Sequence, residues 1–278
     1  MAKILDGKKL SLLKGEELKK RILSLDKRPT LVIIQVGDKK ESNTYIKHKK
    51  DFAKLVGAEI IHKIYPDTVS EDELVRDIEI FNIDSSINGI IVQLPIPASL
   101  NSNLIINKIA AKKDVDGQTS ESLKKLVDNE PRFIPATTRG IMTLLDYYGL
   151  EPSGKKVVIV GRSTLVGKPT ALALINKNAT VTMCHSKTAN LKEETKRADI
   201  LIVAIGKPEF INGDFVHESQ VVIDVGINFI KTNGQNRLVG DVDFEEVKEI
   251  VSRITPVPGG VGPMTVLSLF LNLFDASR

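Results

Sequence analysis

Apolar runs recur at a regular spacing in the second half of this 278-residue chain. They begin near residues 156, 179, 200 and 220 and read KVVIV, ATVTM, ILIVAIG and QVVIDVG. Each interval of 20 to 23 residues holds one strand and one short helix, which is the rhythm of a doubly wound parallel sheet that binds nucleotides. Continuous apolar strands, unlike alternating ones, indicate a sheet covered on both faces.

The first half follows the same logic. Strands are expected at 31–37, 58–65 and 88–95, and helices at 9–25, at about 43–56 and after the capping box Ser70-x-x-Glu73. A proline-containing stretch, 129–140, separates the halves, and we expect the domain change there. Residues 255–263 are too rich in Pro and Gly for a regular element and precede an apolar helix, Met264 to Phe274. The sequence therefore predicts an α/β protein of two domains.

Composition excludes several other classes. At 42% hydrophobic and 27% charged residues the chain is globular, and no apolar run approaches the roughly 18 residues of a membrane span. A net charge of +4, 5% aromatic residues and no Trp argue against nucleic-acid binding. One cysteine, Cys184, excludes a disulfide framework, and the four histidines show no metal-binding spacing, so no metal is expected. With no apolar signal segment at the start, we expect a cytoplasmic protein.

A glycine-containing turn follows the strand KVVIV. It reads Gly161-Arg162-Ser163-Thr164-Leu165-Val166-Gly167 and leads into an apolar helix. Such a turn presents backbone N–H groups to a phosphate at the positive end of a helix dipole. The pattern G-x-S-x-x-x-G departs from the usual G-x-G-x-x-G, so the alternative of a plain tight turn stays open. Its place at the first turn of a βαβ series favours a dinucleotide.

The expected second strand indicates which dinucleotide is bound. An NAD-binding fold normally carries an Asp or Glu about 20 residues after the turn, to hold the ribose 2′-hydroxyl. No acidic residue occurs between Arg162 and Lys192, and the strand ends in CHSKT with Ser186 and Lys187. These groups suit a 2′-phosphate, so NADP is favoured over NAD. The alternative is that Arg162 and Lys187 are solvated surface charges.

Three other segments carry polar residues of interest. Tyr45 and Lys49 are spaced i, i+4 and share one helix face, where a ring can flank a flat heterocycle and a buried lysine can transfer protons. Gln93 ends the third strand, and Asp116 lies in the turn KDVDG, residues 113–117. Ligands of open α/β sheets bind at such strand ends. A solvated basic helix face, a capped strand and an Asx turn are the respective alternatives.

Taken together, these segments resemble the bifunctional methylenetetrahydrofolate dehydrogenase/methenyltetrahydrofolate cyclohydrolase family over nearly the whole chain. The resemblance rests on seven ordered motifs: SNTYIKHK, VQLPIP, KDVDG, VVIVGRSTLVGKPTA, ATVTMCHSKT, VVIDVGIN and TPVPGGVGPMTV. It implies two α/β domains with a cleft between them and, as a rule, a homodimer. It implies a folate-binding catalytic domain at 1–136, completed by 256–278, and an NADP-binding Rossmann-like domain at 137–255.

The resemblance also implies roles for single residues. Tyr45 looks like the residue that stacks on the pterin ring, Lys49 like the catalytic lysine of the cyclohydrolase, and Gln93 like its hydrogen-bonding partner. Asp116 looks like the anchor of the pterin amino group, and catalysis is assigned to these four. The remaining matches are a folate-lining loop and a set of cofactor contacts: Pro258, Gly259 and Gly260 for folate, and Gly161, Arg162, Ser163, Ser186 and Ile227 for NADP.

Two positions depart from the family pattern. The usual P-C-T-P-x-G appears here as residues 135–140, PATTRG, without the cysteine or the second proline. The second lysine that often follows the catalytic one is Asp51 here, which changes the charge beside Lys49.

These observations predict an NADP-dependent oxidation of 5,10-methylenetetrahydrofolate to the methenyl form, followed by hydrolysis to 10-formyltetrahydrofolate. Three alternatives stay open. One is another NADP oxidoreductase of a small acid, which Tyr45, Lys49 and Asp116 together disfavour. The second is a catalytically silent binding protein, which would be expected to have lost Lys49 or Asp116. The third is a relative that retains only one of the two activities.

Overall fold

The computed structural model describes residues 1–232 and 235–278 and divides the chain into two compact units. The three-stranded unit consists of Leu12–Ala136 and Val266–Arg278, and the six-stranded unit of Met1–Ser11 and Thr137–Thr265. Helices α1 (Gly7–Leu23) and α10 (Val261–Ala276) therefore each begin in the six-stranded unit and end in the other. Within the described residues, no helix is both long and apolar enough to cross a membrane.

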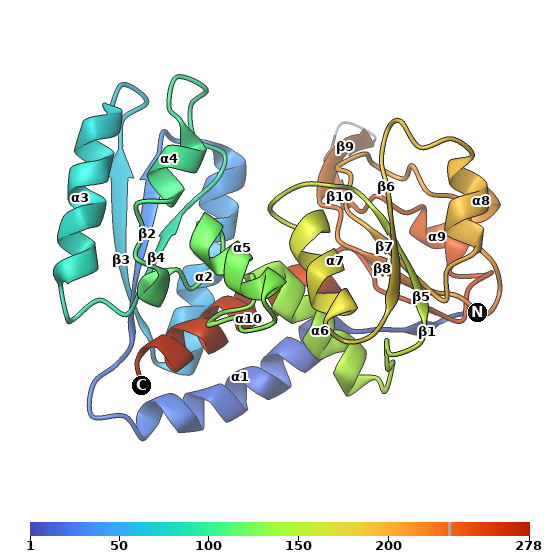
Figure 1. Ribbon diagram of the computed structural model, residues 1–278, viewed down its shortest axis with the longest axis horizontal. Helices are drawn as coiled ribbons and strands as arrows, with labels where there is room; N and C mark the ends of the chain where they lie inside the picture. Colours follow the sequence, from blue (N-terminus) through green and yellow to red (C-terminus); the bar gives the residue numbers. More distant parts are fainter. Residues whose placement is uncertain (233–234) are drawn as a thin grey trace. The chain divides into compact units, whose positions relative to one another are not determined.

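The three-stranded unit is a parallel sheet with helices on both faces (Figure 1). Its strands lie in the order β3 (Glu59–Tyr65), β2 (Thr30–Val36) and β4 (Gly89–Val92). The other elements of this unit are α2 (Lys40–Val56), α3 (Glu71–Ile83), α4 (Ser102–Ile106), the 3₁₀ turn η1 (Ala111–Lys113) and α5 (Ser120–Val127). The expected capping box is present, because the Ser70 hydroxyl accepts a hydrogen bond from the Glu73 N–H.

Alternate residues of β2 enter two separate cores. Leu31 and Ile33 pack with α1, α2 and α10, whereas Val32 and Ile34 pack with α3 and α4. All seven β2 residues are buried. This double coverage is the physical reason for the continuous apolar run.

The six-stranded unit is a doubly wound, Rossmann-like parallel sheet. Its strands lie in the order β1 (Lys3–Ile4), β11 (Arg253–Ile254), β8 (Val221–Asp224), β7 (Ile200–Val203), β5 (Lys156–Val160) and β6 (Thr180–Cys184). Its helical elements are α6 (Ala136–Tyr147), α7 (Gly167–Ile175), α8 (Leu191–Lys196), the 3₁₀ turn η2 (Gly213–Phe215) and α9 (Phe244–Val247). Strands β9 (Asn228–Thr232) and β10 (Gln235–Val239) form an antiparallel pair.

The chain order places a switch point in this sheet. From β5 the chain passes to β6 on one side and then to β7 on the other. Ligands of such sheets bind beyond the carboxyl ends of the two strands that flank the switch, here β5 and β7.

The units differ from the predicted domains at the two ends of the chain. Residues 1–11 and 256–265, expected with the first domain, pack with the six-stranded unit. The reason is β1, which pairs with β11 at the edge of the six-stranded sheet. The stretch 255–263 was also expected to lack regular structure, but α10 begins within it at Val261.

Candidate active site

The Lys49 amine is held by a hydrogen bond to Gln93, which lies on a different element of the same unit. It lies on α2, and its Nζ donates to Oε1 of Gln93 at 2.8 Å. Gln93 follows β4, and its backbone N–H donates to the Ile34 carbonyl of β2 at 2.8 Å. Its side-chain Nε2 donates to the Leu94 carbonyl at 2.8 Å. Both ends of the carboxamide are therefore fixed, with the oxygen directed at the lysine.

Asp116 belongs to a turn that is built around its neighbour Asp114. The Asp114 side chain is buried, and its carboxylate accepts three hydrogen bonds, from Gln118 N, Thr119 N and Ser122 Oγ at 3.1, 2.8 and 2.6 Å. Asp116 is half-buried, and its Oδ2 accepts a hydrogen bond from the Gln118 side chain. Asp114 therefore holds the turn, and Asp116 is left as the carboxylate that faces the lysine.

Gly117, which follows Asp116, meets a close backbone approach. Its φ is +66°, and a Cβ there would lie 2.9 Å from Cα of Pro135. Both the conformation and the contact require glycine. At the departure in residues 135–138, Ala136 is buried in the core, and the Thr138 and Thr170 hydroxyls lie 3.0 Å apart.

Burial sets the electrostatics of this pair. It lowers the pKa of the Lys49 amine, although Asp116 acts in the opposite direction. It likewise raises the pKa of the Asp116 carboxyl, with Lys49 opposing and Asp114 adding to the shift. The desolvation of each group outweighs their attraction, so the neutral forms are favoured more than in water. Asp51 is exposed, and the charge that acts on the Lys49 pKa is Asp116.

Tyr45 lies one turn before Lys49 on the same face of α2. Its side chain is half-buried, and burial raises the pKa of the phenol. The ring therefore stays neutral and offers a partly exposed flat surface beside the amine. Tyr45, Lys49, Gln93 and Asp116 all belong to the three-stranded unit.

The glycine turn after β5 is packed tightly. Gly161 has φ +131°, and a Cβ there would lie 2.2 Å from the Ala204 carbonyl oxygen that follows β7. Its N–H donates to the Cys184 carbonyl at the end of β6 at 2.9 Å. The turn thus leaves the sheet at the switch point with its backbone held against both neighbouring strands.

Ser163 organises the start of α7. Its hydroxyl accepts hydrogen bonds from the backbone N–H groups of Val166 at 3.1 Å and Gly167 at 3.3 Å. Arg162 and Ser163 are both exposed. Two helix-start N–H groups thus already have a partner in Ser163, while Arg162 points its charge at solvent.

The end of β6 lies beside this turn. Ser186 and Lys187 are exposed, and their loop is closed by two hydrogen bonds, from His185 N to Thr188 Oγ1 at 2.8 Å and from Lys187 N to His185 Nδ1 at 3.1 Å. Because Gly161 bonds to the last residue of β6, Arg162 and Ser186 leave the same edge of the sheet. The backbone of Arg162 and that of Ser186 therefore follow the carboxyl ends of two paired strands, β5 and β6.

Two buried carboxylates hold the loops after β7 and β8. Asp241 accepts hydrogen bonds from the amides of Ile205, Gly206 and Lys207 at 2.6, 3.0 and 2.8 Å, and from Asn228 Nδ2 at 2.8 Å. Asp224 accepts hydrogen bonds from the amides of Gly226, Asp241 and Val242, and burial raises its pKa to about 7. The exposed Ile227 lies between these anchored segments. Neither carboxylate was expected from the sequence, although an acidic residue within the apolar run QVVIDVG marks Asp224 as unusual.

The loop Pro258–Gly260 lies in the six-stranded unit. The Gly259 carbonyl accepts a hydrogen bond from Lys8 N at 2.7 Å, so the loop packs against the start of α1. Pro258 is exposed and Gly260 is buried.

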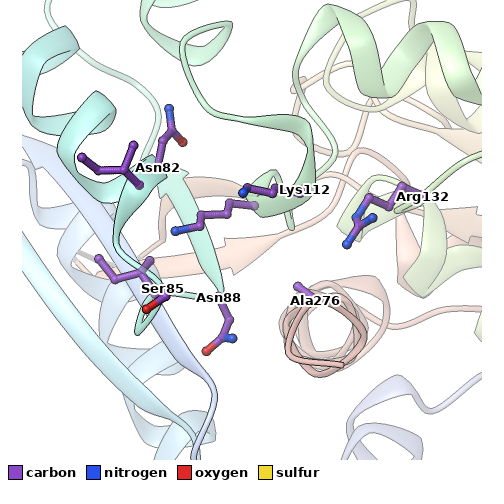
Figure 2. A pocket seen from close by; sticks show the side chains of 9 residues that line it. Asn82, Ser85, Asn88, Lys112, Arg132 and Ala276 are labelled. Carbon is purple, nitrogen blue, oxygen red and sulfur yellow. The ribbon is translucent and has the colours of Figure 1, made fainter.

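A separate cavity of about 240 Å³ lies near Asn88, the residue before β4 (Figure 2). Asn88, which precedes β4, lines it together with Asn82, Lys112 and Arg132. The buried Lys113 also contributes, but its Nζ donates to the carbonyls of Phe81 and Asp84 at the end of α3. Nowhere in the described part of the chain do three or more metal-binding side chains gather.

A Rossmann-like sheet with a glycine turn at its switch point, accompanied by a lysine–amide–carboxylate site, defines a dinucleotide-binding α/β enzyme class. The chain belongs to the tetrahydrofolate dehydrogenase/cyclohydrolase family. The catalytic domain of that family matches residues 5–116, and its NAD(P)-binding domain matches residues 135–278.

Relatives and solved structures of this family match the chain along nearly its full length. The bifunctional protein FolD of Thermodesulfovibrio yellowstonii is 45% identical over 280 residues, covering 100% of this chain and 97% of the relative. The crystal structure of the bifunctional FolD methylenetetrahydrofolate dehydrogenase/cyclohydrolase of Campylobacter jejuni is 40% identical, with a TM-score of 0.96 over 100% of this chain and 99% of that one. The Trypanosoma brucei enzyme, solved with NADP cofactor and an inhibitor, is 33% identical, with a TM-score of 0.95 over 99% and 97%.

Proposed function

We propose that this chain is a bifunctional enzyme of one-carbon metabolism. It oxidises 5,10-methylenetetrahydrofolate to 5,10-methenyltetrahydrofolate with NADP and hydrolyses the product to 10-formyltetrahydrofolate. The observation that carries this proposal is the hydrogen bond from Lys49 Nζ to Gln93 Oε1, formed beside Asp116 in the unit matched by the family's catalytic domain.

The folate ring is recognised by two of these residues. The Asp116 carboxylate accepts hydrogen bonds from the amino and ring N–H groups of the pterin, for which a carboxylate is the natural partner. The Tyr45 ring forms a wall under the flat heterocycle. Pro258, Gly259 and Gly260 supply part of the lining.

The six-stranded unit fits the cofactor. The close approach of Gly161 to the Ala204 carbonyl leaves a turn without side-chain bulk, as a pyrophosphate requires. Arg162 and Ser186 lie at the edge where a 2′-phosphate would be held, and no acidic residue occurs between Arg162 and Lys192. Ser163 shapes the turn, and Ile227 lies on a loop that Asp224 and Asp241 hold in place. Bound NADP supplies the hydride acceptor.

The oxidation requires little acid–base catalysis from the protein. The nitrogen lone pairs of the substrate drive hydride loss from the methylene carbon, so the protein contributes orientation. Asp116 and Tyr45 provide that orientation by fixing the ring system. Lys49 takes no proton in this step.

The hydrolysis needs a proton to be taken from water and a proton to be given to nitrogen, and Lys49 is suited to both transfers. The neutral amine, favoured by burial, accepts a proton as water attacks the methenyl carbon. The resulting ammonium then donates this proton to the ring nitrogen whose bond to carbon breaks, and the hydroxyl on that carbon releases its remaining proton to solvent as the formyl carbonyl forms. Gln93 Oε1 keeps Nζ in one orientation throughout.

One absorbance assay tests the proposal. Purified protein is given methylenetetrahydrofolate with NADP or with NAD, and reduced nicotinamide and methenyltetrahydrofolate are followed separately. We expect NADPH to form, methenyltetrahydrofolate to be consumed, and NAD to serve poorly. Absence of NADPH formation from folded protein would overturn the dehydrogenase, and stable methenyltetrahydrofolate would overturn the cyclohydrolase.

We further propose a homodimer in the cytoplasm. Both are properties that the resemblance or the composition led us to expect, and they are tested independently of catalysis. Light scattering on the eluting protein gives the mass, expected at twice 30.6 kDa. Cell fractionation with an antibody gives the compartment.

A further inference from the structure

Behind the lysine site, a continuous chain of hydrogen bonds joins α2 to the sheet. Lys50 Nζ donates to His62 Nδ1 at 2.8 Å, and His62 Nε2 donates to Gln35 Oε1 at 2.8 Å. Gln35 Nε2 then donates to Asn43 Oδ1 at 2.7 Å, and Asn43 Nδ2 donates to Asp38 Oδ1 at 2.6 Å. Every donor points the same way, from an ammonium at one end to a carboxylate at the other, so the bonds polarise one another.

The central residue of this hydrogen-bond network is Gln35, which is only 2% exposed. It lies on β2 in an otherwise apolar strand, and its Nε2 also donates to the Gly37 carbonyl at 2.9 Å. His62 lies on the neighbouring strand β3 as the register partner of Ile33, two residues before Gln35, and burial and the Lys50 charge lower its pKa and favour the neutral ring. A neutral ring can accept from Lys50 and donate to Gln35 at once.

The network holds α2 at two points. Asn43 and Lys50 lie seven residues apart on the helix, or about 10 Å along its axis. Tyr45 and Lys49 lie between them. The N-cap residue of α2, Lys39, makes no side-chain capping bond, and Asn43 supplies side-chain hydrogen bonds near this end of the helix.

Apolar packing alone would fix the helix less well. Contacts of α2 with the core come from apolar side chains such as Ile46 and Val56 and from the Phe52 ring, whose centroid lies 5.4 Å from that of Phe270, and such contacts are less directional than hydrogen bonds. Hydrogen bonds to a buried amide are directional and limit rotation of the helix about its axis. A rotation would move Lys49 Nζ away from Gln93 and Asp116.

We propose that Gln35 and His62 are positioning residues for the hydrolysis step, fixing α2 so that Lys49 meets Gln93. The inference rests on the proposed function, because it concerns the same lysine. Neither residue touches the substrate. Both act through the helix that carries Tyr45 and Lys49.

The test replaces Gln35 by Met, which keeps the length of the side chain and removes its hydrogen bonds. In Gln35→Met we expect kcat of the cyclohydrolase to fall about 10- to 100-fold, because small misplacements of a catalytic group are costly. The dehydrogenase kcat falls much less, the folate KM rises in both reactions, and the NADP KM is unchanged. His62→Leu gives the same pattern, and the double variant is little worse than either single one, because both break one network. His62→Gln, which keeps a donor and an acceptor, restores part of the lost kcat.

Gln220→Met is the matched control. Gln220 is also buried, but it lies in the six-stranded unit, where its Nε2 donates to the carbonyls of Thr195 and Ala198. We expect that variant to have a lower melting temperature and unchanged rates in both reactions. Should Gln35→Met not fold, Asn43→Ala at the exposed end of the network decides the matter, with a smaller fall in the same direction.

The outcomes separate the inference from the proposed function. A lower melting temperature with unchanged kinetic constants in the Gln35, His62 and Asn43 variants makes the network purely structural and overturns the inference. Wild-type protein without cyclohydrolase activity overturns the proposed function instead.

Discussion

At the scale of single residues, the proposed role of the Lys49 amine differs between the two reactions. Hydrolysis needs the amine to accept and return a proton, whereas hydride transfer does not. We expect Lys49→Met to abolish the cyclohydrolase and to impair the dehydrogenase much less. Both rates are measured on the same folded preparation, with circular dichroism as the control. Near-normal hydrolysis by the variant would exclude Lys49 from the proton transfers.

The pKa of Lys49 also sets a pH dependence. Burial lowers that pKa below its ordinary value of 10.5, and the amine form grows as pH rises through it. We therefore expect cyclohydrolase kcat to increase with pH along a limb whose midpoint lies below 10.5. The dehydrogenase kcat, measured in the same buffers, lacks this limb. A hydrolysis rate that falls across the same range would mean that the ammonium is the form required.

Arg162 is the residue that we propose to determine the preference for NADP over NAD. A charge-assisted contact to a phosphate contributes about 1.5–3 kcal/mol, so Arg162→Ala lowers kcat/KM for NADP by about 10- to 150-fold. Its value for NAD changes little, because NAD lacks the 2′-phosphate. Steady-state kinetics with both cofactors measure the ratio. Equal use of NADP and NAD by the unaltered protein contradicts the assignment.

At the scale of the elements, most of the fold follows from the local pattern. The predicted run 31–37 is β2 at Thr30–Val36, and the glycine turn lies between β5 and α7 as expected. These elements are long or strongly apolar, so local sequence is enough to reveal them. Strands β1 and β11 have two residues each and exist because they pair with one another across the length of the chain. No local pattern marks such pairing.

The turn between β5 and α7 offers a prediction about an element. Gly161→Ala combines a φ of +131° with a Cβ 2.2 Å from the Ala204 carbonyl oxygen, and strain and clash together cost about 2–5 kcal/mol of unfolding free energy. Gly154→Ala is the control, because φ is +71° there but no described heavy atom lies within 4 Å, and it costs about 1–2 kcal/mol. Denaturant titration gives both values. We expect NADP binding to be lost in Gly161→Ala and kept in Gly154→Ala. Equal unfolding free energies of the two variants would rule out the close approach of residue 161 to the Ala204 carbonyl oxygen.

At the scale of the whole molecule, the residues of the proposed sites could be predicted from the sequence more readily than the hydrogen-bond network that holds α2. Lys49, Gln93 and Asp116 stand in motifs that are visible in the sequence, and the structure brings Lys49 to both of the others. Gln35 was visible only as a lone polar residue in an apolar strand. Its partners His62 and Asn43 come from β3 and α2, and only the register of the sheet brings them together. Local sequence carries no information on that register.

Asp116, the proposed anchor of the pterin, belongs to the three-stranded unit, and Arg162, the proposed contact to the 2′-phosphate, belongs to the six-stranded unit, and this division has a measurable consequence. A ligand that binds only the folded protein stabilises it by about 2.7 kcal/mol at 100 times its Kd. We therefore expect NADP and a folate substrate analogue each to raise the melting temperature of the wild-type protein. In Arg162→Ala the shift caused by NADP shrinks and that caused by folate stays. In Asp116→Ala the pattern is reversed, because the contact to the pterin is lost and the glycine turn is intact.

The two aspartates of the turn separate anchoring from stability in this experiment. Asp114 accepts three hydrogen bonds from Gln118, Thr119 and Ser122, which follow the turn, so Asp114→Ala lowers the melting temperature of the ligand-free protein. Asp116→Ala changes that temperature less, because the Asp116 side chain accepts one bond, from Gln118, and because desolvation, which raises the pKa of this half-buried carboxyl, disfavours its charged form. Folate affinity, measured by calorimetry, falls about 10-fold or more in Asp116→Ala, since at least one charge-assisted bond is lost. If Asp116→Ala instead keeps folate affinity and lowers the melting temperature as much as Asp114→Ala does, its carboxylate serves only the turn, and both proposed reactions need another anchor.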